Sequence, residues 1–448
     1  MVALDMSVVN VALPDMDAGL GFDDSGLLWV VNAYALAFGG LLMLGGRLAD
    51  IIGGRRTLLY GLVLFGAASL AGGLVRSPGA LITARAVQGV GAAALAPVAF
   101  ALITLTFPPG PARSRALGLW GMASAAGGAL GVLAGGLLTD WAGWRAVMLV
   151  NVPIVLFALA GAVRWVPRTR RGDGPPPGFD LVGALLVTAG MSALVLGLVR
   201  TESAGWNSTA TVGTLAAAAL LLAAFVAVEL RVPQPLLRIG LLAHRPVLAA
   251  NLCTLLLFSG QFAAFYFTSL YLQRVLAYGP VPTGLAFLPF SAGIVVGSLA
   301  ATRLVGRFGP RPLLVAGGLL GAAGFGWFGL AVDVHAGFSD SILGPSLTAS
   351  VGIGLCVVPL GTAGTTGVGA AEAGMASGVL NSSRQIGGSL GLAVLATVAA
   401  QAAGGDGPAA LTHGYATAYG VAGGLLLAAA LVAWLLLPGS PRAADRGR

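Results

Sequence analysis

Lysine is absent from this chain, and charge of either sign is scarce. Of 448 residues, 24 are basic, all of them arginine, and 16 are acidic, so that charged residues make up 9% of the sequence. Soluble domains carry about 25% charged residues, so this composition argues against a soluble fold. Without lysine no Walker A loop can form, which excludes an ATP-driven pump encoded by this chain alone.

Cysteine and histidine are also rare. Cys253 and Cys356 fall in apolar segments without disulfide or metal-ligand spacing, and we interpret them as small packing residues. The three histidines lie too far apart for a local metal motif. A glycine fingerprint at 89–94 and a nucleophile-elbow pattern at 387–391 follow no predicted strand. We therefore expect no metal, no cofactor and no enzymatic activity.

Long runs without charge make up most of the sequence, which is 57% hydrophobic and contains 70 glycines. A helix needs about 20 apolar residues to cross a membrane core. Together with a shorter apolar segment at 1–14, the runs predict an all-α integral membrane protein with fourteen spans packed through small residues. The runs are 25–46, 57–75, 86–112, 116–139, 146–163, 181–199, 203–228, 246–273, 275–302, 312–332, 341–371, 385–405 and 407–441.

The basic residues gather in alternate loops, and the positive-inside rule assigns those loops to the cytoplasm. The intervening loops carry mainly aspartates. Because the arginines are dispersed rather than gathered in a stripe, we expect no nucleic-acid partner. We expect a multi-pass protein of a bacterial cell (inner) membrane with a cytoplasmic C-terminus. The arginines concerned are Arg55, Arg56, Arg113, Arg115, Arg168, Arg170, Arg171, Arg231, Arg238, Arg245, Arg303, Arg307, Arg311, Arg442, Arg446 and Arg448.

The segment from Met1 to Pro14 gives only about 21 Å of helix, too short for a span. It has no basic leader, and Asp5 does not suit the apolar core of a signal peptide. We interpret it as the outer part of a first helix that ends near Pro14, N-terminally truncated because its beginning lies upstream of Met1.

An internal repeat divides the chain. The segment Arg47 to Arg55 reappears as Arg303 to Arg311, displaced by 256 residues. This offset exceeds six helices and their loops by the length of two more spans, so two parallel halves are expected with two extra helices between them. The predicted parts are an N-terminal six-helix half (1–166), a cytoplasmic linker (167–180), two additional helices (181–231), a C-terminal six-helix half (232–437) and a cytoplasmic tail (438–448).

Several motifs resemble those of the major facilitator superfamily, in particular its fourteen-helix drug:proton antiporter family. Residues 4–14 (LDMSVVNVALP) resemble the first-helix motif, and 46–56 (GRLADIIGGRR) resemble the motif of loop 2–3. Residues 85–92 (RAVQGVGA) resemble the fourth-helix motif, whose arginine is associated with proton transfer. The resemblance covers nearly the whole chain and implies the major facilitator fold.

A glycine-rich segment resembles the fifth-helix motif of exporters, and Trp144-Arg145 and Asn151-Val152-Pro153 follow it. Its glycines are Gly127, Gly131, Gly135 and Gly136. The family usually has Gly-Pro where this chain has Gly131-Val132. Since a proline kink is missing, glycine alone would have to bend the helix.

Asp5 is the one acid well inside a predicted span of the first half, and an intramembrane ionisable group is a functional candidate by default. With helix ends near Pro14 and Gly79, Asp5 lies about 14 Å and Arg85 about 9 Å below one face, so the two could share a layer. Burial favours the protonated acid and a neighbouring guanidinium favours the ionised one. The pair is therefore our proton-coupling candidate; the alternative is a fixed ion pair that joins two helices.

Asp50, Arg55 and Arg56 lie at the predicted cytoplasmic end of the second helix. Membrane orientation explains the arginines but not the acid. By resemblance, this group is a conformational latch that holds one state of the transporter and opens during its rocking motion. The repeat has Gly306 where the first half has Asp50, so only one half keeps the acid.

Polar and aromatic residues within spans are the candidates for lining a substrate path, although each could equally pack or lie at the interface. Arg384 borders an uncharged run and could attract an anion, pair with Glu372 or extend to the membrane edge. Gln261 lies 256 residues after Asp5, so the second half presents a neutral group there. The substrate-lining candidates are Asn32, Tyr34, Trp120, Gln261, Phe265, Tyr271, Asn381 and Gln385.

The resemblance implies proton-coupled export of small apolar organic compounds, such as drugs or antibiotics, by alternating access. The proton gradient would be the energy source, and we expect a monomer in the lipid bilayer whose partners are protons and a small-molecule substrate. Two alternatives within transport are a narrow-specificity metabolite exporter and an uptake symporter. The alternative of another class is a membrane receptor or scaffold without transport.

Overall fold

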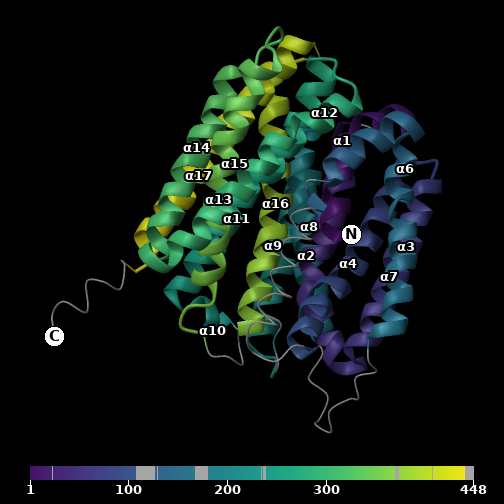
Figure 1. The fold of residues 1–448 in the computed structure, drawn as a ribbon, viewed down its shortest axis with the longest axis vertical. Coiled ribbons are helices and arrows are strands. Elements are labelled where there is room, and N and C mark those ends of the chain that lie inside the picture. Colours follow the sequence, from purple (N-terminus) through teal and green to yellow (C-terminus); the bar gives the residue numbers. More distant parts are fainter. Residues whose placement is uncertain are drawn as a thin grey trace, which may run out of the picture. The chain divides into compact units, whose positions relative to one another are not determined.

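The computed structural model describes residues 1–22, 24–106, 127–128, 130–166, 180–233, 235, 239–368, 373–405 and 407–438, and within them every regular element is a helix (Figure 1). The all-α prediction is confirmed. The elements are α1 (Val2–Leu20), α2 (Asp24–Ile52), α3 (Gly54–Leu74), α4 (Pro78–Thr106), α6 (Trp144–Leu149), α7 (Asn151–Trp165), α8 (Leu181–Ala204), α9 (Thr209–Glu229), α10 (Ile239–Leu242), α11 (Arg245–Leu270), the π-helix η1 (Tyr271–Val275), α12 (Pro280–Ala286), α13 (Leu288–Phe308), α14 (Pro310–Ala331), the π-helix η2 (Ser339–Leu343), α15 (Gly344–Gly364), α16 (Ala373–Ala403) and α17 (Pro408–Leu436).

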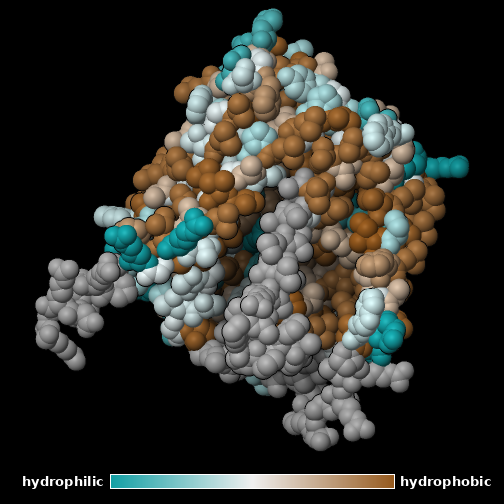
Figure 2. Space-filling view, viewed as in Figure 1, coloured by the Kyte–Doolittle hydropathy of each residue, from teal (hydrophilic) through white to brown (hydrophobic). Residues whose placement is uncertain are grey.

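Among the described residues, 11 helices are long and apolar enough to cross a membrane. The expected spans at 1–14, 25–46 and 116–139 correspond to α1 and to shorter apolar helices over Gly26–Leu42 and Leu130–Ala142. The count of fourteen therefore stays a prediction. Large apolar side chains are exposed along the helices, as Figure 2 shows for one face, and Leu330 is 90% exposed. Such a surface suits lipid, because water would penalise it.

The chain forms two compact units. Unit 1 comprises Met1–Leu194, Gly213–Leu236 and Gly279–Leu285, and unit 2 comprises Val195–Val212, Leu237–Tyr278 and Ala286–Arg448. The units do not follow the predicted domain boundaries strictly, because α8 contributes to both and Gly279–Leu285 belongs to unit 1. Residues 167–179 of the predicted linker and 439–448 of the tail lie outside the described residues.

Helix α1 does not end near Pro14, as the sequence suggested, but continues to Leu20. A proline inside a helix removes one hydrogen bond, and neighbouring helices make this tolerable in a membrane protein. The helix ends instead at Gly21, whose positive φ of 67° lets its N–H bond the carbonyl of Asp17. The fully buried residues of α1 run from Asp5 to Met16, so the helix extends beyond the apolar segment that predicted it.

The predicted repeat is visible in matched helices. α3 (Gly54–Leu74) and α14 (Pro310–Ala331) begin 256 residues apart, and each follows a glycine with positive φ, 92° at Gly53 and 79° at Gly309. Both residues adopt a backbone conformation that side chains rarely tolerate, so glycine is required at both turns. The same helix-turn-helix geometry is therefore built twice, once in each unit.

Glycines bring helices of each unit into backbone contact. In unit 1 a Cβ on Gly89 of α4 would lie 2.5 Å from the carbonyl oxygen of Tyr34 on α2. In unit 2 a Cβ on Gly387 of α16 would lie 2.5 Å from the carbonyl oxygen of Leu255 on α11, and the Ser259 hydroxyl donates to the Gly387 carbonyl at 2.8 Å. This small-residue packing is what the glycine content predicts for helices in lipid.

Candidate functional site

A buried carboxylate lies at the centre of unit 1. Asp5 on α1 is 0% exposed, and three side chains from two other helices, α4 and α7, donate hydrogen bonds to it. Arg85 donates to Oδ2 at 2.6 Å, while Asn151 and Gln88 donate to Oδ1 at 2.7 and 3.3 Å. Asp5 and Arg85 thus share a layer, as the sequence suggested, although the assumed end of α1 was wrong.

Arg85 on α4 is held from several sides. Its side chain is 2% exposed, its Nε donates to the carbonyl of Val30 on α2 at 3.0 Å, and Nη1 also donates to Gln88 at 2.9 Å. The guanidinium carbon lies 4.3 Å from the centre of the Tyr34 ring. A planar guanidinium can serve carboxylate, carbonyl, amide and aromatic face at once, which an ammonium cannot do.

Three members of this cluster were not predicted as site residues. Gln88 links the ion pair to α3, because its amide nitrogen also donates to the Ser69 hydroxyl at 2.6 Å. Asn151 stands at the first position of α7. Gln88 lies in the segment 85–92 that resembles the fourth-helix motif, and Asn151 lies in Asn151-Val152-Pro153. Their places in these motifs could have marked both as site residues. Nothing in the sequence distinguishes Ser69 from the other small residues of its helix.

The hydrogen bonds explain how a buried ion pair is tolerated. Removing two charges from water costs several kcal/mol per ion unless their remaining donors and acceptors are satisfied. Asp5 accepts from one cation and two amides, and Arg85 donates to three different partners. The ionised pair is therefore stabilised by protein groups, and Asp5 is the only acid in this cluster of described residues.

Two further predicted residues of unit 1 carry unsatisfied polar atoms. Asn32 on α2 is 0% exposed, and neither its Oδ1 nor its Nδ2 has a hydrogen-bond partner among the described residues. The Tyr34 hydroxyl is likewise buried without one. Buried polar groups are nearly always paired, so these atoms call for a partner that no described residue supplies.

The exporter-type glycines face α1 close to Asp5. A Cβ on Gly131 would collide with Ser7 and the Leu4 carbonyl, and one on Gly135 would meet the Val8 backbone. Gly127 lies against Leu4, and Gly136 against Pro280, which also belongs to unit 1. The helix that contains these glycines therefore rests directly on the helix that carries the buried acid.

The proposed latch is described only in part. The side chain of Asp50 lies outside the described residues, as does Trp120 of the substrate-lining set. Arg56 is exposed, whereas Arg55 donates to the carbonyl of Val163 on α7 at 2.7 Å. Arg55 thus ties the start of α3 to the end of α7 within unit 1.

The candidates of unit 2 are spread over α11, η1 and α16. Gln261 on α11 is half-buried with Oε1 unpartnered within the described part of the chain, and Phe265 stacks on Phe287 with ring centres 5.2 Å apart. Tyr271 is 0% exposed and donates to the Asp333 carbonyl at 2.7 Å, so its hydroxyl anchors a loop in this structure. On α16, Asn381 is exposed and donates to the Ser377 carbonyl, while Gln385 is buried.

Arg384 lies on α16 with its guanidinium carbon 4.4 Å from the centre of the Phe258 ring, and it is exposed. No described residue forms an ion pair with it, and Glu372 lies outside the description. On α11, Thr254, Phe258, Gln261 and Phe265 recur at helical spacing and share one face. The hydroxyl of Thr254 is buried and unpartnered in the described structure, so this face combines aromatic rings with unused polar atoms.

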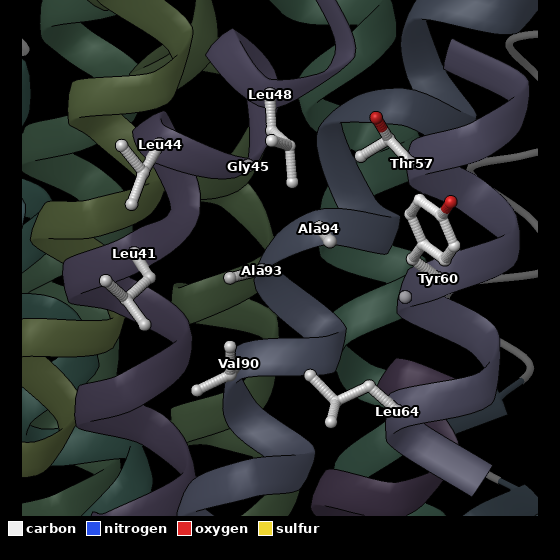
Figure 3. A pocket seen from close by; sticks show the side chains of 11 residues that line it. Leu41, Leu44, Gly45, Leu48, Thr57, Tyr60, Leu64, Val90, Ala93 and Ala94 are labelled. Carbon is white, nitrogen blue, oxygen red and sulfur yellow. The ribbon is translucent and has the colours of Figure 1, made fainter. Parts of the chain in front are cut away.

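A cavity of about 150 Å³ opens between α2, α3 and α4. Figure 3 shows its lining, which is apolar apart from Thr57 and Tyr60 and holds no member of the Asp5 cluster. Tyr60 is 63% exposed, so the cavity opens on the surface of unit 1. It can accommodate an apolar chain, but its lining contains no charged side chain. The lining residues are Leu41, Leu44, Gly45, Leu48, Thr57, Tyr60, Gly61, Leu64, Val90, Ala93 and Ala94.

Among the described residues no group of three or more His, Cys, Asp or Glu side chains could hold a metal ion. Cys253 and Cys356 are buried free thiols, as expected of packing residues.

Known proteins resemble this chain along nearly all of its length. The model of the Major Facilitator Superfamily matches residues 1–392. Puromycin resistance protein pur8 of Streptomyces alboniger is 44% identical, covering 99% of this chain and 90% of that protein. Cephamycin export protein CmcT of Amycolatopsis lactamdurans is 43% identical, covering 100% and 92%.

Solved structures share the fold at low sequence identity. A bacterial homologue of the human lysosomal transporter Spinster, in an inward-facing and unoccupied conformation, gives a TM-score of 0.67 at 14% identity and covers 97% of this chain and 93% of that one. The xylose transporter XylE from E. coli gives 0.64 at 15%, covering 98% and 95%. The predicted family and fold are confirmed: this chain belongs to the major facilitator superfamily and is a multi-pass membrane transporter.

Proposed function

We propose that this transporter exports small, largely apolar organic compounds, antibiotics among them, in exchange for protons. The observation that carries the proposal is the buried pair of Asp5 and Arg85, which places one titratable acid inside a membrane helix bundle. The relatives named for puromycin resistance and cephamycin export support the direction and the class of cargo.

The proton cycle follows from the bonds of Asp5. In its ionised form the carboxylate attracts Arg85 and holds α1 against α4. A proton taken up from the outer side removes that charge, so the contact weakens and the arginine turns to its other partners, Val30 and Gln88. Release of the proton to the cytoplasm restores the pair. Alternation between these states would drive the alternating access of the bundle, with Asp50, Arg55 and Arg56 as a latch at its cytoplasmic end.

In each unit the cargo would contact polar atoms that have no partner among the described residues. Unit 1 offers Asn32 and Tyr34 for this, and unit 2 separately offers Gln261 together with the aromatic face of Phe265. A few polar groups among apolar walls are typical of sites for small organic molecules. A broad substrate range would follow, because aromatic faces and amides accept many shapes.

The test is efflux from proteoliposomes under an imposed pH gradient, with puromycin as one of the compounds. We expect the wild type to expel compound only when the gradient is present, and Asp5→Asn to bind the same compound without gradient-driven efflux. Accumulation in the opposite direction would indicate an uptake symporter. Binding without any flux in the wild type would indicate a receptor, and full efflux by Asp5→Asn would remove this residue from the coupling step.

A further inference from the structure

The two amides that contact Asp5 differ in how fully they are bonded. Gln88 is engaged at both ends: its nitrogen donates to Ser69 and Asp5, and its oxygen accepts from Arg85. Asn151 donates to Asp5 Oδ1 at 2.7 Å, but its own Oδ1 is buried and has no hydrogen-bond partner among the described residues. Asn151 is 0% exposed, so bulk solvent does not reach this oxygen.

A free hydrogen-bond acceptor beside a carboxylate can accept the O–H that forms when the carboxylate gains a proton. The ionised acid only accepts hydrogen bonds, whereas the protonated acid must also donate one. In this cluster Arg85 can only donate, and the oxygen of Gln88 is already occupied by Arg85. The free oxygen of Asn151 belongs to the side chain that already contacts Oδ1 of Asp5.

We propose that Asn151 is a positioning residue that serves both protonation states of Asp5. Its NH₂ group donates to the ionised carboxylate. When Oδ1 of Asp5 takes up a proton, the amide turns by half a rotation about its Cβ–Cγ bond, and its oxygen then accepts the new O–H. No other hydrogen bond of the Asn151 side chain is made or broken, and the proton leaves by the reverse motion. The inference rests on the proposed function, because it assumes that Asp5 titrates during transport.

Among the side chains that donate hydrogen bonds to Asp5, only Asn151 has a free acceptor for this role. The groups that face Asp5 from neighbouring elements are Arg85 and Gln88 on α4, the Tyr34 ring region on α2 and Asn151 on α7, and the α-amino group of Met1 lies within electrostatic range. Turning the Gln88 amide would break its bonds to Arg85 and Ser69 together. Turning the Asn151 amide breaks only its N–H bond to Oδ1 of Asp5, which is replaced by the bond from the new O–H to the amide oxygen.

Infrared difference spectroscopy of the purified protein in lipid vesicles tests this without transport. A pH jump should produce a carboxyl C=O band that Asp5→Asn removes. With isotopically labelled asparagine, a side-chain amide band should change at the same pH, and both Asp5→Asn and Asn151→Leu should abolish that change. In Asn151→Leu the carboxyl band should move to higher frequency, because the acid loses its acceptor.

The same variants separate this inference from the proposed function. We expect gradient-driven efflux to fall about tenfold or more in Asn151→Leu, the equivalent of one buried hydrogen bond, and Asn151→Ser to recover part of it because a hydroxyl both donates and accepts. Asn251→Leu is the matched control, a buried amide of unit 2 that bonds Ser383. Efflux and carboxyl band unchanged in Asn151→Leu would overturn the role of Asn151, whereas absence of gradient-driven efflux in the wild type would overturn the proposed function itself.

Discussion

The two units use the same helical framework but differ in charge at matching positions. At the repeat offset of 256 residues, Asp5 of unit 1 is matched by Gln261 of unit 2. Gln261 is neutral, so among the described residues it forms no counterpart of the ion pair; Ser341 in η2 donates to the carbonyl of Gly337 at 3.0 Å. The repeat supplies the scaffold, and substitutions on one side supply the ionisable chemistry.

This difference has an energetic side. A buried ion pair needs a full set of neighbouring donors and acceptors, and unit 1 provides amides, a hydroxyl and a carbonyl around it. In unit 2 the corresponding glutamine is neutral and leaves its oxygen unpartnered within the described residues. In the proposed function, unit 1 would hold and release the proton, and the neutral group of unit 2 would interact with the transported compound.

The largest effect should separate the two matching positions. We expect Asp5→Asn to reduce gradient-driven efflux to the level of empty vesicles, because the titrating group is lost. Gln261→Leu should change efflux by less than about tenfold, since it removes a single neutral hydrogen-bonding group. Efflux of both variants is measured under the same pH gradient. Equal losses of efflux would contradict the assignment of different roles to the two units.

Removing the cation of the buried ion pair should lower the free energy of unfolding of the protein. Arg85→Ala leaves Asp5 buried without its cation, and we expect a loss of about 3–5 kcal/mol. Combining it with Asp5→Asn should recover part of that loss, because no unpaired charge remains. Unfolding in detergent followed by tryptophan fluorescence measures both, with Ser341→Ala as the control in unit 2. A double variant less stable than Arg85→Ala would contradict the account.

A smaller and equal effect is expected at the two repeated turns. Gly53→Ala and Gly309→Ala each force a side chain into a backbone region reserved for glycine, at about 1–3 kcal/mol. Gly306→Ala is the control, because Gly306 lies in α13 with open space around it. Thermal unfolding of the three variants gives the comparison. Unequal losses at Gly53 and Gly309 would show that the repeat is not built alike in both units.

The smallest effect is expected from two cysteine substitutions that leave transport unchanged and test the orientation of the protein in the membrane. Pro310 begins α14, and Gly337 follows the end of that helix. In cells, a cysteine at position 310 should be protected from a membrane-impermeant thiol reagent and one at 337 should react, because the arginine-rich ends face the cytoplasm. The native cysteines are buried and provide the background. The opposite pattern would show that the arginine-rich end of α14 faces the outside of the cell.

Much of the fold could be predicted because membranes impose a simple rule. A helix in lipid needs an apolar length, so uncharged runs identified most of the spans, and the offset between Arg47 and Arg303 identified the repeat. The end of α1 was missed, since Pro14 looked like a stop although neighbouring helices allow it inside a helix.

The candidate site was predictable only where charge marks it. Asp5 and Arg85 stand out because ionisable groups are rare in spans. Asn151, Gln88 and Ser69 are neutral, and similar residues occur elsewhere in the helices, so only their distances reveal their role. The bond from Arg55 to Val163 depends on how α3 packs against α7, which no local pattern contains.

Three helices of unit 2 meet without a layer of side chains between them. A Cβ on Gly317 would lie 2.6 Å from the Gly352 carbonyl oxygen, and one on Gly354 would lie 3.0 Å from Gly297 Cα, so α14, α15 and α13 touch through their backbones. Such contacts contain no rotamers that could rearrange to absorb a displacement. We therefore expect α13, α14 and α15 to move together as one rigid group, so that any bending occurs at chain segments outside it.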